Sequence, residues 1–88
     1  MDEEINVEII TSGYLRSTCG FECENLMVPQ KCQDAFAYVS MWLNESFGID
    51  PATVYVMLND KSINDKSFLG QTVKTGDVFR ILPIMSGG

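Results

Sequence analysis

Apolar and polar residues alternate along Ile5–Ile9, which predicts a strand with one buried face. Phe21–Val28 shows a weaker form of this pattern, and the Gly- and Ser-containing residues between the two stretches predict a loop. Thr53–Leu58 is rich in β-branched residues and predicts a central strand. Lys61–Ile63 predicts a short edge strand, and Val78–Met85 predicts the last strand.

One segment follows the periodicity of a helix instead. Apolar residues recur at intervals of three and four along Cys32–Phe47, and Trp42 widens the apolar stripe. We expect an amphipathic helix of about four to five turns. Pro29 suits its first turn, where the missing N–H costs nothing. Gly48 and Pro51 are typical of residues that follow the end of a helix.

This order of elements predicts an α+β fold, because a single helix covers only one face of a sheet. The helix is long enough to join parallel strands by a right-handed crossover. The arrangement is that of a ubiquitin-like β-grasp: a mixed four- to five-stranded sheet with one main helix on one face. Its first and last strands lie side by side in the middle of the sheet. We expect one domain over residues 1–85 and a flexible C-terminal tail over residues 86–88.

Composition excludes several functions. The 88 residues include 12 acidic and 6 basic side chains, and the net charge of −6 disfavours binding to nucleic acid and to anionic membranes. Histidine is absent, which removes the commonest general base and the commonest metal ligand. The N-terminus lacks the pattern of a signal peptide, and no apolar run is long enough to cross a bilayer. We therefore expect a cytoplasmic protein.

The three cysteines, Cys19, Cys23 and Cys32, are an odd number in a chain without a secretion signal, which is typical of a reducing compartment. Cys19 and Cys23 do not have the spacing of a zinc site, and a second pair of ligands is missing. We expect structural or incidental thiols, no metal site, and no cofactor bound by this chain.

The tail, Ser86-Gly87-Gly88, follows directly on an apolar strand. Glycine has no side chain and adopts any backbone conformation, so such a tail can pass through a narrow channel. It can then bring the Gly88 carboxylate, which is ionised at neutral pH, against the α-phosphate of a nucleotide. The alternative is a frayed terminus without a function.

Several motifs resemble the MoaD/ThiS family of sulfur-carrier proteins. Residues 78–88 resemble its C-terminus, and Gly76-Asp77 resembles the turn that precedes its last strand. Tyr55–Asn59 is similar to its apolar strand that ends in Asn, although Asp60 stands where the family usually has Gly. The chain length and the pair Leu82-Pro83 are closer to MoaD than to ThiS.

The resemblance implies a protein co-substrate and not an enzyme. A ubiquitin-activating-type adenylyltransferase would use ATP to join Gly88 to AMP, and a sulfur-donor enzyme would convert the adenylate to a thiocarboxylate. The large subunit of a synthase would use this sulfur in cofactor biosynthesis, with molybdopterin favoured over thiamin. Two alternatives stay open: a ubiquitin-like modifier conjugated through Gly88, and a β-grasp interaction module without covalent chemistry.

The last strand also predicts a docking face. Arg80 is expected to reach water, so alternation turns Leu82 and Ile84 to the same side. Phe79 and Ile81 then lie in the core. Contiguous exposed apolar side chains are typical of docking sites, whereas singly exposed ones need no explanation. The predicted partner-binding face consists of the outward residues of three neighbouring strands: Ile10, Tyr55, Met57, Arg80, Leu82 and Ile84.

Overall fold

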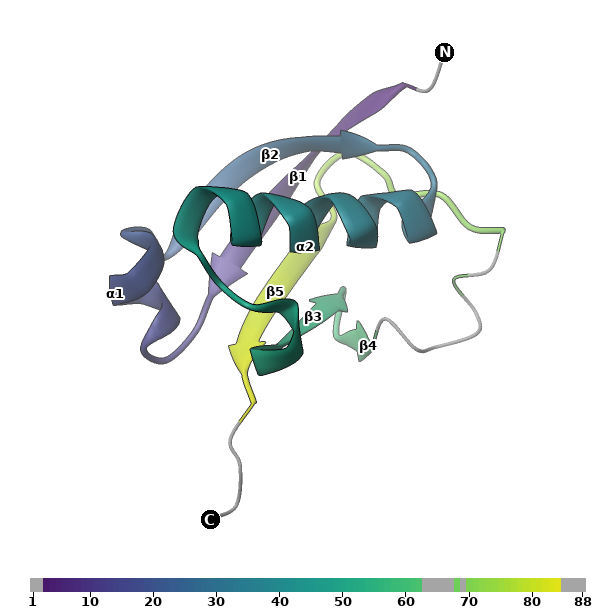
Figure 1. Cartoon of the computed structure of the whole chain (residues 1–88). Helices are drawn as coiled ribbons and strands as arrows, with labels where there is room; N and C mark the ends of the chain where they lie inside the picture. The colour runs from purple at the N-terminus through teal and green to yellow at the C-terminus, as the bar shows by residue number, and fades with distance from the viewer. Residues whose placement is uncertain (1–2, 63–67, 69, 85–88) are drawn as a thin grey trace.

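The computed structural model describes residues 3–62, 68 and 70–84. Within them, five strands form one sheet in the order β2-β1-β5-β3-β4, and helix α2 packs across one face (Figure 1). This confirms the predicted α+β fold, a mixed five-stranded sheet with one main helix. The elements are β1 Glu4–Thr11, α1 Leu15–Cys19, β2 Cys23–Pro29, α2 Cys32–Phe47, the 3-10 turn η1 Pro51–Thr53, β3 Val54–Leu58, β4 Lys61–Ser62 and β5 Val78–Pro83.

The first and last strands lie side by side in the middle of the sheet, as predicted, and they run parallel. β1 pairs antiparallel with β2, and β5 pairs antiparallel with β3. The short β4 folds back on β3 through the two-residue turn Asn59-Asp60, whose φ angles of 49° and 70° are both positive. Two-residue hairpins favour this backbone because it matches the twist of the strands, and Asn and Asp tolerate it better than most residues.

The core lies between α2 and the sheet, and it follows the predicted alternation. Phe79 and Ile81 of β5 are both 0% exposed, and Phe36 of α2 meets Phe79 edge-on with ring centres 5.3 Å apart. α2 ends at Gly48, whose φ of 69° favours glycine and whose N–H donates to the Asn44 carbonyl. The residues that α2 buries are Cys32, Ala35, Phe36, Val39 and Leu43, and those of β1 and β3 include Val7, Ile9, Val54, Val56 and Leu58.

Two expectations for the N-terminal half were wrong. Residues 15–19 form the helix α1 and not a loop, with Leu15 buried beneath it. A helix of five residues is held by such tertiary contact and is too short to show periodicity. Pro29 ends β2 and does not open α2, which begins at Cys32. A proline fits here because β2 is an edge strand, where a ladder donor is dispensable.

Several strand boundaries also differ from the prediction. β1 spans Glu4–Thr11 and is longer than the predicted Ile5–Ile9, and β3 begins one residue after Thr53. β2 begins at Cys23 and not at Phe21, because the Phe21 ring turns to pack against Trp42 and Phe47. β5 ends at Pro83, although the Ile84 N–H still donates to the Thr53 carbonyl at 3.0 Å. The predicted strands Lys61–Ile63 and Val78–Met85 each end in a residue, Ile63 or Met85, that lies outside the described residues.

Candidate functional site

The face of the sheet opposite α2 carries the outward residues of β5, and we call it the outer face. The burial of Phe79 and Ile81 gives β5 the predicted phase, so Arg80 and Leu82 point to the outer face and are half-buried there. Ile84 is 38% exposed and Tyr55 is 56% exposed. These are large apolar or aromatic side chains in water, which is the property expected of a docking surface.

The strand register brings five of the six predicted residues together. Arg80 pairs with Ile10 on one side and with Met57 on the other, so these three side chains form one row across β1, β5 and β3. Leu82 pairs with Tyr55 in the next row. Directly opposed residues have Cβ atoms about 5 Å apart, close enough for side-chain contact. The sixth residue, Ile84, follows the end of β5 and lines a hollow together with Tyr55 and with Ser40 of α2, so it lies at the margin of this surface.

Arg80 is the basic residue of the outer face, and Glu8 of β1 points to the same side of the sheet. The Nε of Arg80 lies 3.8 Å from Asp60 Oδ1, and the Arg80 side chain is 42% exposed and that of Asp60 85%. An exposed pair at this distance contributes little to stability, so Arg80 can exchange Asp60 for a carboxylate on a partner. A hollow of about 220 Å³ lies beside it, lined by Ile10, Asn59, Asp60, Val78 and Arg80.

The C-terminal end of β5 is held from both sides. The Ser12 N–H donates to the Ile81 carbonyl at 3.2 Å, and the Ile84 N–H bonds to Thr53. Gly13, with a φ of 62°, lies so close to Pro83 that a Cβ at this position would come within 3.3 Å of the proline ring. The chain is therefore fixed up to Ile84. The predicted tail, Ser86, Gly87 and Gly88, lies outside the described residues.

The two motifs before β5 have structural roles. Asn59 Oδ1 accepts a hydrogen bond from the Val78 N–H at 3.0 Å, and the Asn59 N–H donates to the Val78 carbonyl at 2.9 Å. At the Gly76-Asp77 turn, the Glu8 N–H donates to the Asp77 carbonyl at 2.9 Å. These bonds tie the start of β5 to β3 and to β1. They set the register that places Arg80 beside Ile10 and Met57.

The three cysteines are free thiols: Cys19 is half-buried, Cys23 is exposed and Cys32 is buried. Burial raises the pKa of Cys19 and of Cys32. The pKa of Cys23 is raised chiefly by the hydrogen bond that its thiol donates to Glu8 Oε1 at 3.3 Å. All three are therefore protonated and weakly nucleophilic at neutral pH.

Cys23 is an outer-face neighbour that the sequence did not indicate. It pairs with Ile10, so it extends the row of Ile10, Arg80 and Met57 onto β2. The alternation in β2 places it there, but only once the start of that strand is known.

Among the residues described, no three or more His, Cys, Asp or Glu side chains are grouped so that they could hold a metal ion. No helix in the described ranges is long and apolar enough to cross a membrane.

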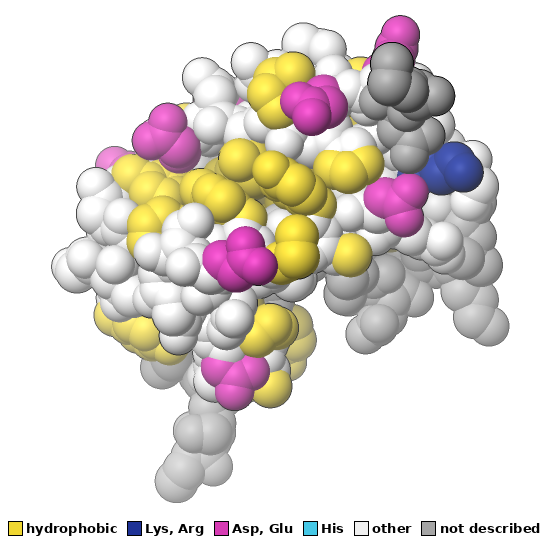
Figure 2. All heavy atoms as spheres, turned by 45° about the horizontal axis from the view of Figure 1, so that its top comes forward, with side chains coloured by type: hydrophobic (Ala, Val, Ile, Leu, Met, Phe, Trp, Pro, Cys, Tyr) yellow, Lys and Arg dark blue, Asp and Glu magenta, His cyan; other side chains and the backbone are white. Residues whose placement is uncertain are grey.

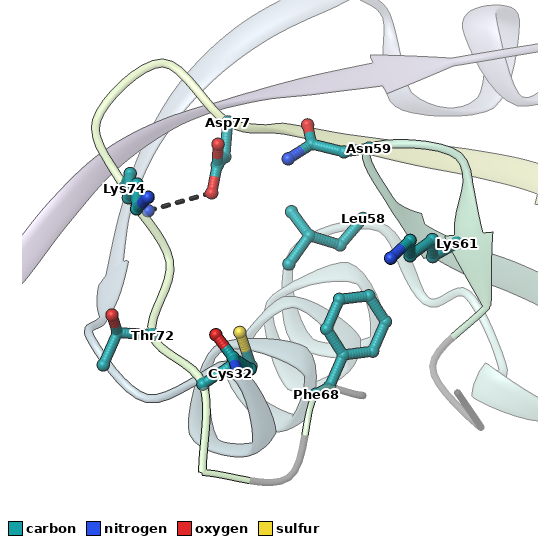
Figure 3. A pocket seen from close by; sticks show the side chains of 9 residues that line it. Cys32, Leu58, Asn59, Lys61, Phe68, Thr72, Lys74 and Asp77 are labelled. Atoms are coloured by element: carbon teal, nitrogen blue, oxygen red, sulfur yellow. Dashed lines mark hydrogen bonds between the residues drawn. The ribbon is translucent and has the colours of Figure 1, made fainter. Parts of the chain in front are cut away.

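A larger hollow, of about 380 Å³, lies at the opposite end of β5 from Ile84 (Figure 3). Leu58 and Phe68 point into it, and Lys61 and Lys74 lie at its sides. Its carboxylate, Asp77, already accepts the Lys74 N–H at 2.9 Å within the turn. Because this hollow is remote from the C-terminal end of β5, the outer face is the stronger candidate for a site that acts together with the tail.

Solved structures resemble this chain along nearly its whole length. Small archaeal modifier protein 1 from Methanosarcina acetivorans has a TM-score of 0.68 at 20% identity, over 97% of this chain and 98% of that one. The HVO 2177 protein of Haloferax volcanii has a TM-score of 0.69 at 16% identity, over 98% and 89%. A candidate molybdopterin converting factor, subunit 1, from Pyrococcus furiosus has a TM-score of 0.64 at 14% identity, over 92% and 99%.

The chain has the ubiquitin-like β-grasp fold. The likeness spans nearly the whole of both chains in each comparison and is not confined to a fragment. The neighbours include a modifier protein and a molybdopterin converting factor subunit, so the resemblance to MoaD/ThiS-like β-grasp proteins is confirmed for the fold. No protein-family model and no curated protein sequence matches the chain.

Proposed function

We propose that this protein is a carrier whose C-terminal glycine, Gly88, is adenylated and then converted to a thiocarboxylate that donates sulfur in cofactor biosynthesis. One observation carries the proposal. Arg80 and Leu82 of β5 point to the outer face, and Ser86-Gly87-Gly88 follow them closely in the sequence. A partner that docks on the outer face therefore receives the tail, in a fold that modifiers and a molybdopterin converting factor subunit also have.

In the proposed reaction, an oxygen of the Gly88 carboxylate attacks the α-phosphorus of ATP, and pyrophosphate leaves. A sulfur-donor enzyme then delivers sulfur at the oxidation level of sulfide (HS⁻) to the Gly88 carbonyl carbon. The new C–S bond forms, the bond between this carbon and the phosphate oxygen of AMP breaks, and AMP leaves with a proton released to the solvent. ATP and the catalytic groups belong to the partners in this scheme, so the chain is a co-substrate and not an enzyme. The raised pKa values of Cys19, Cys23 and Cys32 favour an external source of sulfur, because protonated thiols are poor nucleophiles.

The outer face serves successive partners in this proposal. The ubiquitin-activating-type adenylyltransferase binds it during activation, and the large subunit of a synthase binds it during sulfur transfer. The aromatic ring of Tyr55 and the apolar side chains of Leu82 and Ile84 suit the buried centre of such an interface. Molybdopterin is the favoured product because Leu82-Pro83 resembles MoaD and because one neighbour is named as a molybdopterin converting factor subunit.

A second candidate function is protein modification, which the likeness to small archaeal modifier protein 1 favours. Activation is the same in both cases. In the modifier, a lysine amine of another protein attacks the activated Gly88 carbonyl and forms an isopeptide bond, while AMP leaves and the amine loses a proton. The two functions differ only in the nucleophile that attacks the Gly88 adenylate.

Intact-mass analysis of the protein recovered from its own cells tests both functions. A carrier gains the mass difference between sulfur and oxygen, located at Gly88 by fragmentation. A modifier gives higher-mass species joined to lysine. A variant that lacks Gly87 and Gly88 is the matched control and should give neither. If the wild-type chain shows only an unmodified carboxylate and no conjugates, while the truncated variant retains full activity in cells, both covalent functions are contradicted.

A further inference from the structure

A second apolar surface lies on the helix side of the sheet, between β2 and α2. Figure 2 shows hydrophobic side chains gathered there in a band, with several acidic side chains around it and a basic side chain near one end. Five half-buried residues that pack against the core make up this surface, which we call the aromatic seam: Phe21, Leu26, Tyr38, Trp42 and Phe47. None of them belongs to the outer face, because α2 covers the opposite side of the sheet.

The rings of the aromatic seam pack against one another and remain partly open to water. Phe21 lies between Trp42 and Phe47, with ring centres at 6.0 and 5.8 Å, and Trp42 meets Phe47 edge-on at 5.3 Å. The most buried stripe of α2, from Cys32 to Leu43, faces the middle of the sheet. Tyr38 and Trp42 lie on the flank of this stripe, towards β2, so their rings are not fully covered.

Beside the aromatic seam runs the open edge of the sheet. β2 is the terminal strand in the sheet order, and within the described ranges no strand pairs with its outer edge. The Thr11 N–H donates to the Glu22 carbonyl at 3.0 Å, so alternation turns the backbone of Glu24 and Leu26 towards β1. The N–H and C=O groups of Cys23, Asn25 and Met27 then point outward.

This edge lacks most devices that usually block strand addition. Its register with β1 runs without interruption from Glu4–Pro29 to Ile10–Cys23, so no bulge twists it away. The residues Cys23–Pro29 contain no lysine, and the proline stands at the very end of the strand. An incoming strand can therefore pair along most of β2.

The rim of the aromatic seam is acidic. Asp34 and Glu45 share the flank of α2 that carries Tyr38 and Trp42, because residues three, four, seven and eight apart lie on one side of a helix. Glu24 lies on the strand side, next to the open edge. These carboxylates are exposed. Their charge favours a partner with Lys or Arg and disfavours a second copy of this chain, which would bring like charges together.

We propose that the edge of β2 binds an extended segment of a partner protein that carries apolar side chains at alternate positions and Lys or Arg at both ends. The segment forms main-chain hydrogen bonds with Cys23, Asn25 and Met27, and its apolar side chains lie on the aromatic seam. Its basic ends meet Glu24, Asp34 and Glu45. Binding there leaves the outer face and the tail accessible, so this inference does not depend on the proposed function.

The test uses the full chain and a synthetic peptide with four valines at alternate positions between two pairs of lysines. Trp42 is the single tryptophan of the chain, so its fluorescence reports on the aromatic seam directly. We expect a saturable change in this fluorescence, and amide shifts in NMR spectra that concentrate on β2 and α2. A peptide with glutamates in place of the lysines should bind about tenfold more weakly or worse.

Two pairs of variants test separately how much the β2 edge and the acidic rim contribute to binding. Glu24→Lys/Glu45→Lys should weaken binding of the lysine peptide about tenfold or more, whereas Glu3→Lys/Glu4→Lys, with the same net charge, should change it less than about twofold. Asn25→Pro removes an outward N–H and should abolish binding, whereas Asn25→Thr should retain it. If Asn25→Pro does not fold, the charge pair decides.

Four outcomes overturn the proposal. They are failure of the lysine peptide to bind, equal affinity for the two peptides, an unchanged affinity of Glu24→Lys/Glu45→Lys, and amide shifts confined to the outer face. Sedimentation of the free chain tests whether a second copy of the chain occupies the edge of β2 instead. A concentration-dependent dimer that Asn25→Pro abolishes would show that a second copy binds the edge of β2, contrary to the proposal.

Discussion

The outer face and the aromatic seam are both apolar, but they offer a partner different kinds of contact. The outer face lies on β5, which is paired on both sides, so its backbone groups are already used and recognition depends on side chains such as Leu82 and Tyr55. The aromatic seam adjoins the edge of β2, where backbone groups point outward. One small sheet therefore provides a fixed side-chain surface around β5 and an open backbone edge at β2.

The largest effect is expected from the core side of β5. Phe79→Ala should lower the free energy of unfolding by about 3–5 kcal/mol, because it leaves a cavity where a fully buried ring meets Phe36. Chemical denaturation measures this loss. A decrease of less than about 1 kcal/mol would mean that β5 has the opposite phase and that the outer face is assigned to the wrong side of the sheet.

The matching change on the outer side of β5 is Leu82→Glu. It should lower the affinity for the activating enzyme about tenfold or more, because a carboxylate is buried at the centre of the proposed interface. Stability should change by only about 1 kcal/mol, since Leu82 is half-buried and lies outside the core.

The control for Leu82→Glu is Met41→Glu, which places the same carboxylate on an apolar residue of α2 that is 50% exposed. Calorimetric titration of both variants gives the comparison. Equal affinities for Leu82→Glu, Met41→Glu and wild type would remove the outer face from the proposed function.

A smaller effect is expected at Cys23, the residue that links the outer face to β2. Glu8→Gln removes a negative charge next to the thiol, so the pKa of Cys23 should fall towards its ordinary value of 9.0. The thiolate fraction between pH 8 and 9 then rises, and alkylation of Cys23 should become severalfold faster. Site-resolved mass spectrometry across a pH series measures this rate. The rate at the buried Cys32 is the internal control, and an unchanged Cys23 profile would contradict the role of Glu8.

The smallest effect concerns the turn that holds the start of β5. Asp60→Gly should raise the free energy of unfolding by about 0.5 kcal/mol, because glycine adopts the φ of 70° at this position without steric cost. Arg80 loses only a weak, exposed ion pair. Thermal unfolding measures the gain, and a clear loss of stability would show that the Asp60–Arg80 pair matters more than its distance suggests.

The strand phases could be predicted from the sequence because alternation is strong in β1, β3 and β5, and the order of elements indicated that the first and last strands lie side by side in the middle of the sheet. Arg80 alone was sufficient to orient β5. α1 could not be predicted, because a five-residue helix has no periodicity to recognise and depends on the burial of Leu15. The extent of β2 was misjudged because Phe21 continues the apolar pattern of the strand while its ring packs onto Trp42.

The side of the sheet to which Arg80 and Leu82 point could be predicted from alternation, whereas the aromatic seam could not be predicted. Helical spacing identifies Trp42 as part of the apolar stripe of α2, but spacing alone does not separate the centre of a stripe from its flank. Only the position of β2 relative to α2 shows that the Trp42 ring remains partly exposed. The acidic rim could not be predicted from the sequence for the same reason, because Glu24 and Glu45 are distant in sequence and come near the same surface only in the fold.

ATP–pyrophosphate exchange with the activating enzyme of the same cells tests the central claim most directly. The wild-type chain should support exchange, and a variant that lacks Gly88 should not. Leu82→Glu should raise the concentration of carrier needed for half-maximal exchange with little effect on the maximal rate, because it weakens docking and leaves the reacting carboxylate unchanged. Normal exchange without Gly88, or exchange that is insensitive to Leu82→Glu at low carrier concentration, would contradict the account of a tail delivered by the outer face.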